Sequence, residues 1–123
     1  MPTRGIRGAT TIVSDSKENI ISATRELLDA LIASNPDLQP DDIASVLFTV
    51  TDDIVSAYPA VAAREMGWTQ VPMMCAREIP VTGSLQLCIR VLIHWNMDKA
   101  QDGIKHVYLR DAVKLRPDLV AAQ

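Results

Sequence analysis

A net positive charge is missing from this 123-residue chain, which carries 12 Lys and Arg against 15 Asp and Glu and has a formal net charge of −3. Proteins that bind nucleic acid or anionic membranes need an excess of basic residues to replace counterions. We therefore expect neither as a partner, and a site for an anion has to be local.

Long apolar runs and targeting signals are also missing. No stretch approaches the roughly 18–20 apolar residues of a membrane-spanning helix. The N-terminal residues show neither the apolar region of about 7–15 residues nor the small-residue cleavage site of a secretory signal peptide. These absences predict a soluble, cytosolic protein.

Cysteine and histidine are scarce, with two of each and no CxxC pair. Cys75 and Cys88 are expected to be reduced thiols, and His94 and His106 lack the spacing of a metal-ligand set. The glycine motifs of nucleotide-binding loops and of serine-hydrolase nucleophile turns are absent. We expect neither a metal nor a nucleotide cofactor.

The length and composition are those of one globular unit, with 48% hydrophobic and 22% charged residues. A chain of this size can bury one core but not two independent ones. Residues 1–123 are therefore predicted to form a single domain, with a flexible C-terminal tail from about residue 117.

Hydrophobic periodicity predicts two main helices and five strands. A helix of about five turns follows Ser16, which is placed as its N-cap, and ends at Asn35 before Pro36. A shorter helix is predicted over residues 59–66, with Gly67 as its C-terminal stop. The predicted strands cover residues 4–12, 43–50, 71–75, 85–97 and 105–109.

These elements predict an α+β fold with a single mixed sheet, hairpin-like returns between strands and helices on one face. The nearly continuous apolar run over residues 43–50 predicts a central strand covered on both faces. Gly5 and Gly8 are expected to allow close approach of other backbone. Two helices cannot cover both faces of the sheet, so we expect a closed homo-oligomer that buries the rest.

Four arginines stand at positions that the predicted elements fix: Arg7 and Arg90 in strands, Arg64 in the short helix and Arg116 before Pro117. Because the guanidinium group matches carboxylates bidentately and stays charged, such a group suits a small dicarboxylate ligand. The alternative is that each arginine forms an ordinary ion pair with one of the 15 acidic residues.

Four separated motifs carry a resemblance that runs nearly end to end. They are RGIRGATT at residues 4–11, YPAVAAREMGW at 58–68, VPMMCAREIPVTGSLQLCIRV at 71–91 and HVYLRDAVKLRPDL at 106–119. In this order they resemble the monofunctional chorismate mutases of the trimeric, Bacillus-type class. The resemblance implies a homotrimer with a pseudo-α/β-barrel core and interfacial active sites. It also implies rearrangement of chorismate to prephenate in phenylalanine and tyrosine biosynthesis.

The motifs also imply roles for individual residues. Arg90 would hydrogen-bond the ether oxygen of the breaking bond, while Arg7 and Tyr108 would orient the side-chain carboxylate of the substrate. Glu78 would accept a hydrogen bond from the ring hydroxyl. The other implied substrate-binding residues are Arg64 and Arg116 at the rim, and Tyr58, Ala60, Met74, Cys75 and Leu115.

The implied reaction is consistent with the absence of nucleophile and cofactor motifs from the sequence. It is an intramolecular [3,3] shift without proton transfer or a covalent enzyme intermediate, so it needs neither a nucleophile nor a cofactor. Two alternatives remain open at this point. One is an enzyme like the small trimeric enamine/imine deaminases, which share a similar architecture, and the other is a non-catalytic module that binds a carboxylate.

Overall fold

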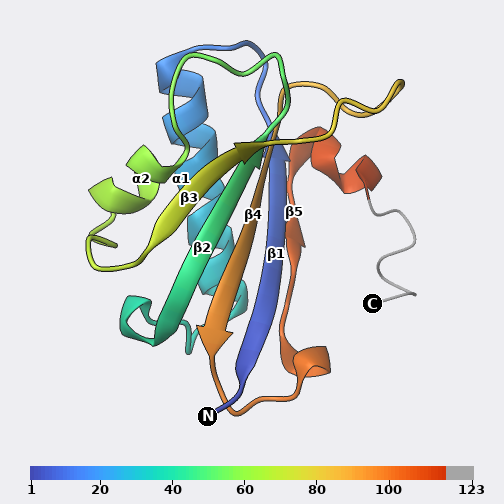
Figure 1. Ribbon diagram of the computed structural model, residues 1–123. Helices are drawn as coiled ribbons and strands as arrows, with labels where there is room; N and C mark the ends of the chain where they lie inside the picture. Colours follow the sequence, from blue (N-terminus) through green and yellow to red (C-terminus); the bar gives the residue numbers. More distant parts are fainter. Residues whose placement is uncertain (116–123) are drawn as a thin grey trace.

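A five-stranded mixed sheet forms the frame of the fold, with strand order β3-β2-β4-β1-β5 (Figure 1). The computed structural model describes residues 1–115. The strands are β1 (Thr3–Thr11), β2 (Ile43–Val50), β3 (Met73–Arg77), β4 (Cys88–Asn96) and β5 (Val107–Tyr108). The prediction of a single mixed sheet is confirmed.

The two α-helices form where the sequence predicts them. Helix α1 (Lys17–Ser34) begins after Ser16, whose hydroxyl accepts a hydrogen bond from the Asn19 amide at 3.1 Å. Helix α2 (Ala60–Glu65) is followed by Gly67, whose φ of 95° only glycine adopts without strain. Three short 3-10 helices complete the described chain: η1 (Pro40–Asp42), η2 (Gln101–Gly103) and η3 (Arg110–Leu115). None of the helices within residues 1–115 is long and apolar enough to cross a membrane.

The strand connections differ from the predicted hairpin-like returns. Strand β4 pairs antiparallel with both β1 and β2, whereas β2–β3 and β1–β5 are parallel pairs. Among the described strands, no two that follow each other in the chain form an antiparallel pair. The prediction of hairpins is wrong because β4 lies between β2 and β1, so the chain passes over β2 on its way from β3 to β4 and over β1 on its way from β4 to β5.

The core lies between one face of the sheet and the helices. Side chains of β4 alternate, so that Ile89, Val91, Ile93 and Trp95 are buried against the helical side. Helices α1 and α2 lie on the same side of the sheet (Figure 1), which leaves the other face, here called the open face, without α-helical cover. Residues 43–50 form an interior strand, β2, between β3 and β4, but the prediction that this strand is covered on both faces is wrong for the single chain. In the single chain β4 is central, and the open-face residues of β2 are only half-buried.

Four strands have other bounds than predicted, and β1 differs by one residue at each end, since it runs over Thr3–Thr11 instead of 4–12. Strand β3 lies two residues later than predicted, because its pairing with β2 begins at Met73 opposite Val46. Strand β4 starts only at Cys88, since Leu87 has a φ of 50° and interrupts the extended backbone. Strand β5 has two residues instead of five.

Gly8 is closely approached by side chains, and not by other backbone as predicted. A Cβ atom at Gly8 would lie 3.0 Å from Leu31 Cδ1, 3.1 Å from Val91 Cγ1 and 3.2 Å from Leu27 Cδ1. The nearest atom to a Cβ at Gly5 would be Leu92 Cδ1 at 3.8 Å, which is ordinary contact. Close packing of α1 on β1 therefore requires glycine at position 8 only.

Candidate active site

A cavity of about 250 Å³ opens on the open face of the sheet. Side chains from β1, β2, β4 and β5 meet there with one from the end of β3 and one from η3. Its lining residues are Arg7, Gly8, Ala9, Leu47, Thr49, Glu78, Arg90, Val91, Leu92, Tyr108 and Leu115. The structure thus brings together five of the residues that the resemblance implies: Arg7, Glu78, Arg90, Tyr108 and Leu115.

Strand register explains this meeting. Arg90 lies opposite Ala9 of β1 on one side and opposite Thr49 of β2 on the other. Ala9 in turn lies beside Tyr108 of β5. Because alternate residues of a strand point to the same face, Arg7 reaches the open face two positions before Ala9.

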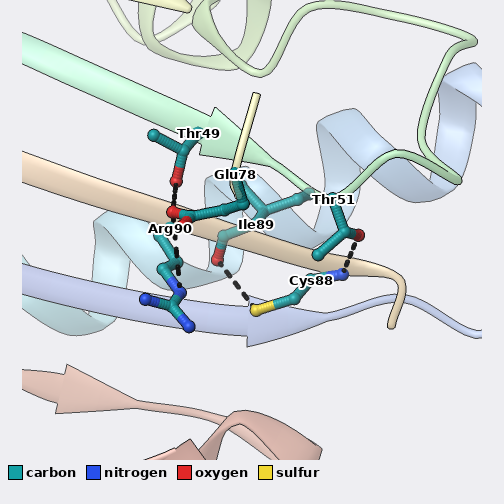
Figure 2. Close-up of polar contacts among 6 residues, drawn as sticks. All are labelled: Thr49, Thr51, Glu78, Cys88, Ile89 and Arg90. Carbon is teal, nitrogen blue, oxygen red and sulfur yellow. Dashed lines mark hydrogen bonds and ion pairs between the residues drawn. The ribbon is translucent and has the colours of Figure 1, made fainter. Parts of the chain in front are cut away.

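Glu78 and Arg90 form a loose ion pair in this cavity. Glu78 Oε2 lies 3.8 Å from Arg90 Nε, and the two side chains are 26% and 44% exposed. The Thr49 hydroxyl donates a hydrogen bond to the same Oε2 atom (Figure 2). A close guanidinium–carboxylate hydrogen bond would measure about 2.7–2.9 Å, so Glu78 does not engage Arg90 closely.

Backbone hydrogen bonds fix the positions from which the two charged side chains extend. The Glu78 amide donates to the Val50 carbonyl at 2.9 Å. On the other side of the intervening loop, the Leu87 amide donates to the Asp53 carboxylate at 3.0 and 3.1 Å. The Cys88 amide donates to the Thr51 hydroxyl at 3.0 Å (Figure 2). Both ends of the loop between Glu78 and Cys88 are therefore tied to the chain that follows β2.

Cys88 lies beside Arg90 but is not a nucleophile candidate. Its side chain is buried, with 1% exposure, and burial raises the pKa of the thiol, although the nearby Arg90 guanidinium opposes the rise. The group is thus a neutral thiol at pH 7 and adds no negative charge beside Arg90.

His106 helps to place Arg7. The Arg7 amide donates to His106 Nδ1 at 3.0 Å, so this ring nitrogen acts as an acceptor. Next to it, the Leu109 amide donates to the Ala9 carbonyl at 2.9 Å. These bonds hold the segment that carries Tyr108 against β1.

Other residues implied by the resemblance lie elsewhere in the chain. Tyr58 and Cys75 line a second cavity of about 670 Å³, which also includes Pro59, Val61 and Arg77. Cys75 is half-buried and packs against the core on the helical side, because odd-numbered residues of β3 face the helices. Within one chain, the structure does not bring this group to the cavity around Arg90.

The remaining implied residues are not in the Arg90 cavity either. Met74 is 71% exposed on β3, and Arg64 is exposed on α2. Ala60 is only 2% exposed and packs in the core. Arg116 and the predicted tail from residue 117 lie outside the described residues.

The predicted site residues left out six lining residues of the cavity: Gly8, Ala9, Leu47, Thr49, Val91 and Leu92. Period-two alternation was an available signal for two of them, because it places Leu47 and Thr49 on one face of β2. Within residues 1–115, no three His, Cys, Asp or Glu side chains gather in a way that could hold a metal ion. The charged groups of the cavity suit a carboxylate ligand, since two of them are guanidinium groups.

Comparisons with known proteins agree with this geometry. The family model of chorismate mutase type I matches residues 3–119. Chorismate mutase AroH from Thermus thermophilus is 54% identical over 120 residues, which cover 98% of each chain. Chorismate mutase AroH from Bacillus subtilis is 46% identical over 120 residues, covering 97% of this chain and 94% of its own.

Solved structures give the same result. A chorismate mutase from Clostridium thermocellum superposes with a TM-score of 0.85 at 50% sequence identity, covering 88% of this chain and 96% of that one. The fold, the cluster of arginines on the open face and nearly full-length sequence similarity therefore lead to one assignment. The chain belongs to the chorismate mutase type I family.

Proposed function

We propose that this chain rearranges chorismate to prephenate in the open-face cavity, with Arg90 as the catalytic residue. Family membership supports the reaction, which serves aromatic amino acid biosynthesis. One observation supports the site above all others. Arg90 lies in a cavity with Arg7 and Tyr108, and its guanidinium is 3.8 Å from the Glu78 carboxylate instead of closely paired with it.

The reaction breaks a C–O bond while it forms a C–C bond within one molecule. Negative charge gathers on the ether oxygen as the C–O bond lengthens. A guanidinium already directed at that oxygen binds the transition state better than the ground state, which raises the rate. We assign this role to Arg90.

The other cavity residues select the reactive shape of the substrate. Arg7 and Tyr108 hold the side-chain carboxylate, and Glu78 accepts a hydrogen bond from the ring hydroxyl. Together they favour the folded conformer in which the reacting carbons are close, and this lowers the entropic part of the barrier. No residue transfers a proton in this scheme.

We further propose a homotrimer in which each active site spans two subunits. The second set of implied residues, with Tyr58 and Arg64, lies outside the Arg90 cavity of its own chain and can complete the cavity of a neighbouring subunit. Exposed apolar side chains at Tyr58, Met74, Ile79 and Val81 support an interface on this side of the molecule. Arg64 and Arg116 are the proposed rim groups for the ring carboxylate.

The two alternative functions are not favoured. A shared fold alone does not separate a mutase from an enamine/imine deaminase or from a carboxylate-binding module. The family model and both curated relatives are chorismate mutases, however.

We also propose a cytosolic location, which is in line with the two free cysteines of the structure. Fractionation of the producing cells tests this location.

Turnover without any additive tests the proposed reaction. We expect the purified protein to consume chorismate, followed by its ultraviolet absorbance, with no cofactor or second substrate present. The same preparation should not accelerate the release of ammonia from 2-imino acids above the rate in buffer alone. Unchanged chorismate with a folded protein, or accelerated ammonia release, would contradict the proposal.

Subunit mixing tests the shared site. Arg90→Ala and the double variant Tyr58→Ala/Arg64→Ala are each expected to be strongly impaired as pure proteins. When the two variants are refolded together in equal amounts, their subunits assort at random. About a quarter of the shared sites then contain an unmutated Arg90 from one subunit and an unmutated Tyr58 and Arg64 from its neighbour. We therefore expect activity well above the mean of the two separate preparations. Mixed trimers of the correct mass without this recovery would show that each site belongs to one chain.

A further inference from the structure

The Glu78 carboxylate lies between Thr49 and Arg90 in the cavity (Figure 2). Thr49 stands directly opposite Arg90 across the β2–β4 pair and beside Ala76 across the β2–β3 pair. Glu78 follows Ala76 by two positions, so its side chain points to the same face. Because the side chain of Ala76 is short, it leaves room for the Glu78 carboxylate to reach Thr49 on β2, whose hydroxyl donates a hydrogen bond to it (Figure 2).

The Thr49 hydroxyl and the Arg90 guanidinium compete for the same oxygen. Thr49 donates to Glu78 Oε2, and Arg90 Nε lies 3.8 Å from that atom. Among residues 1–115, Glu78 is the one carboxylate within 4.0 Å of a nitrogen of Arg90. Threonine also fixes the direction of its hydroxyl, since two heavy atoms on Cβ restrict its rotamers.

We propose that Thr49 is a positioning residue for the rearrangement, whose hydroxyl holds the Glu78 carboxylate away from a close ion pair with Arg90. Two opposite charges this near in a partly buried cavity attract each other strongly. Without a competing donor, the flexible Glu78 side chain closes on the guanidinium and forms charge-assisted hydrogen bonds at about 2.7–2.9 Å. Thr49 thereby keeps the Arg90 donors available to the substrate.

The effect of this positioning falls on the chemical step, and it rests on the proposed function of Arg90 and Glu78. Charge on the ether oxygen is largest in the transition state, so partial neutralisation of Arg90 weakens transition-state binding more than substrate binding. Arg7 and Tyr108 still hold the side-chain carboxylate. A loss in kcat with little change in KM is therefore the expected signature.

Three substitutions separate the hydroxyl from the shape of the side chain. Thr49→Val keeps the branched shape without the donor, and we expect about a tenfold loss in kcat with KM changed less than about threefold. Thr49→Ala, which also lacks the donor, should show the same loss if the valine variant folds poorly. Thr49→Ser restores the hydroxyl and should recover most of kcat. Thr3→Val removes a hydroxyl that donates to Asn96 at the far end of β1 and should leave kcat unchanged.

A structural readout accompanies the kinetics. In crystals of Thr49→Val, the shortest distance between Glu78 and Arg90 should fall from 3.8 Å to about 2.8 Å. In a Glu78→Gln background, Thr49→Val should add no further loss, because the carboxylate through which it acts is gone.

Two kinds of failure are distinguishable. If Thr49→Val and Thr49→Ala keep wild-type kcat while Glu78→Gln is impaired, Thr49 has no positioning role and the proposed site stands. A serine variant as slow as the valine variant also overturns the proposal, because the methyl group would then be the part that matters. If Glu78→Gln itself is unimpaired, the site assignment fails and the role of Thr49 fails with it.

Discussion

Replacement of Arg90 by lysine is expected to lower kcat by about 10²–10³-fold while the fold is kept. Lysine carries the same charge, but it is a point charge on a flexible stem and cannot reproduce the planar set of donors of the guanidinium. The side chain extends into the open-face cavity and is 44% exposed, so the exchange leaves no buried space empty. The expected loss in kcat therefore reports how the positive charge is directed in the cavity, and not a change in the stability of the fold.

The measurement is the initial rate of chorismate loss, with circular dichroism and the mass of the assembly as checks on folding. Arg110→Lys is a matched control, because Arg110 pairs with Glu26 at 3.2 Å on the surface and lies outside the Arg90 cavity. Its kcat should equal that of the wild type. Near-normal turnover by a folded Arg90→Lys variant would remove Arg90 from the role of catalytic residue.

Substitution of Gly8 by valine is expected to have the largest effect on stability. The Cβ of the added side chain alone would lie 3.0–3.2 Å from methyl groups of Leu27, Leu31 and Val91, and valine adds two further carbons to this close contact. Overpacking of this kind costs about 1–3 kcal/mol or more in the free energy of unfolding. For a chain of this size that corresponds to a Tm lower by about 5–15 °C.

Thermal unfolding of Gly8→Val beside Gly5→Ala checks this expectation. A Cβ at Gly5 meets Leu92 Cδ1 at 3.8 Å, which is ordinary contact, so its Tm should shift by only a few degrees. Equal shifts in both variants would mean that glycine at position 8 is not required by the packing of α1 on β1.

The sequence predicted well those helices and strands whose ends are set by neighbouring residues, such as a capping side chain or a proline. Helix α1 begins and ends where Ser16 and Asn35-Pro36 place it, and β2 has the predicted bounds. The strand connections depend instead on which distant strands pair, and the sequence carries little local sign of that. The start of β4 was missed for the same reason, since Leu87 is held by the carboxylate of Asp53, 34 residues earlier.

The candidate site was predictable in part. Alternation and motif position found Arg7, Arg90 and Tyr108, which the cavity brings together. The Thr49 contact was not visible, because it depends on the register in which β2 pairs with β3, and local sequence patterns do not fix that register. Cys75 and Tyr58 lie at another cavity. For Cys75 the reason is again the sheet, because the odd-numbered residues of β3 face the helices within a single chain.

The anchoring at both ends of the segment between Glu78 and Cys88 has a consequence for sequence variation. The amides of Glu78 and Leu87 are fixed to Val50 and Asp53, while the tip around Gly83 is exposed. Insertions or deletions at this tip change the reach of the loop without displacing the two charged groups beside it. Differences in loop length between related chains are therefore compatible with an unchanged arrangement of Glu78 and Arg90.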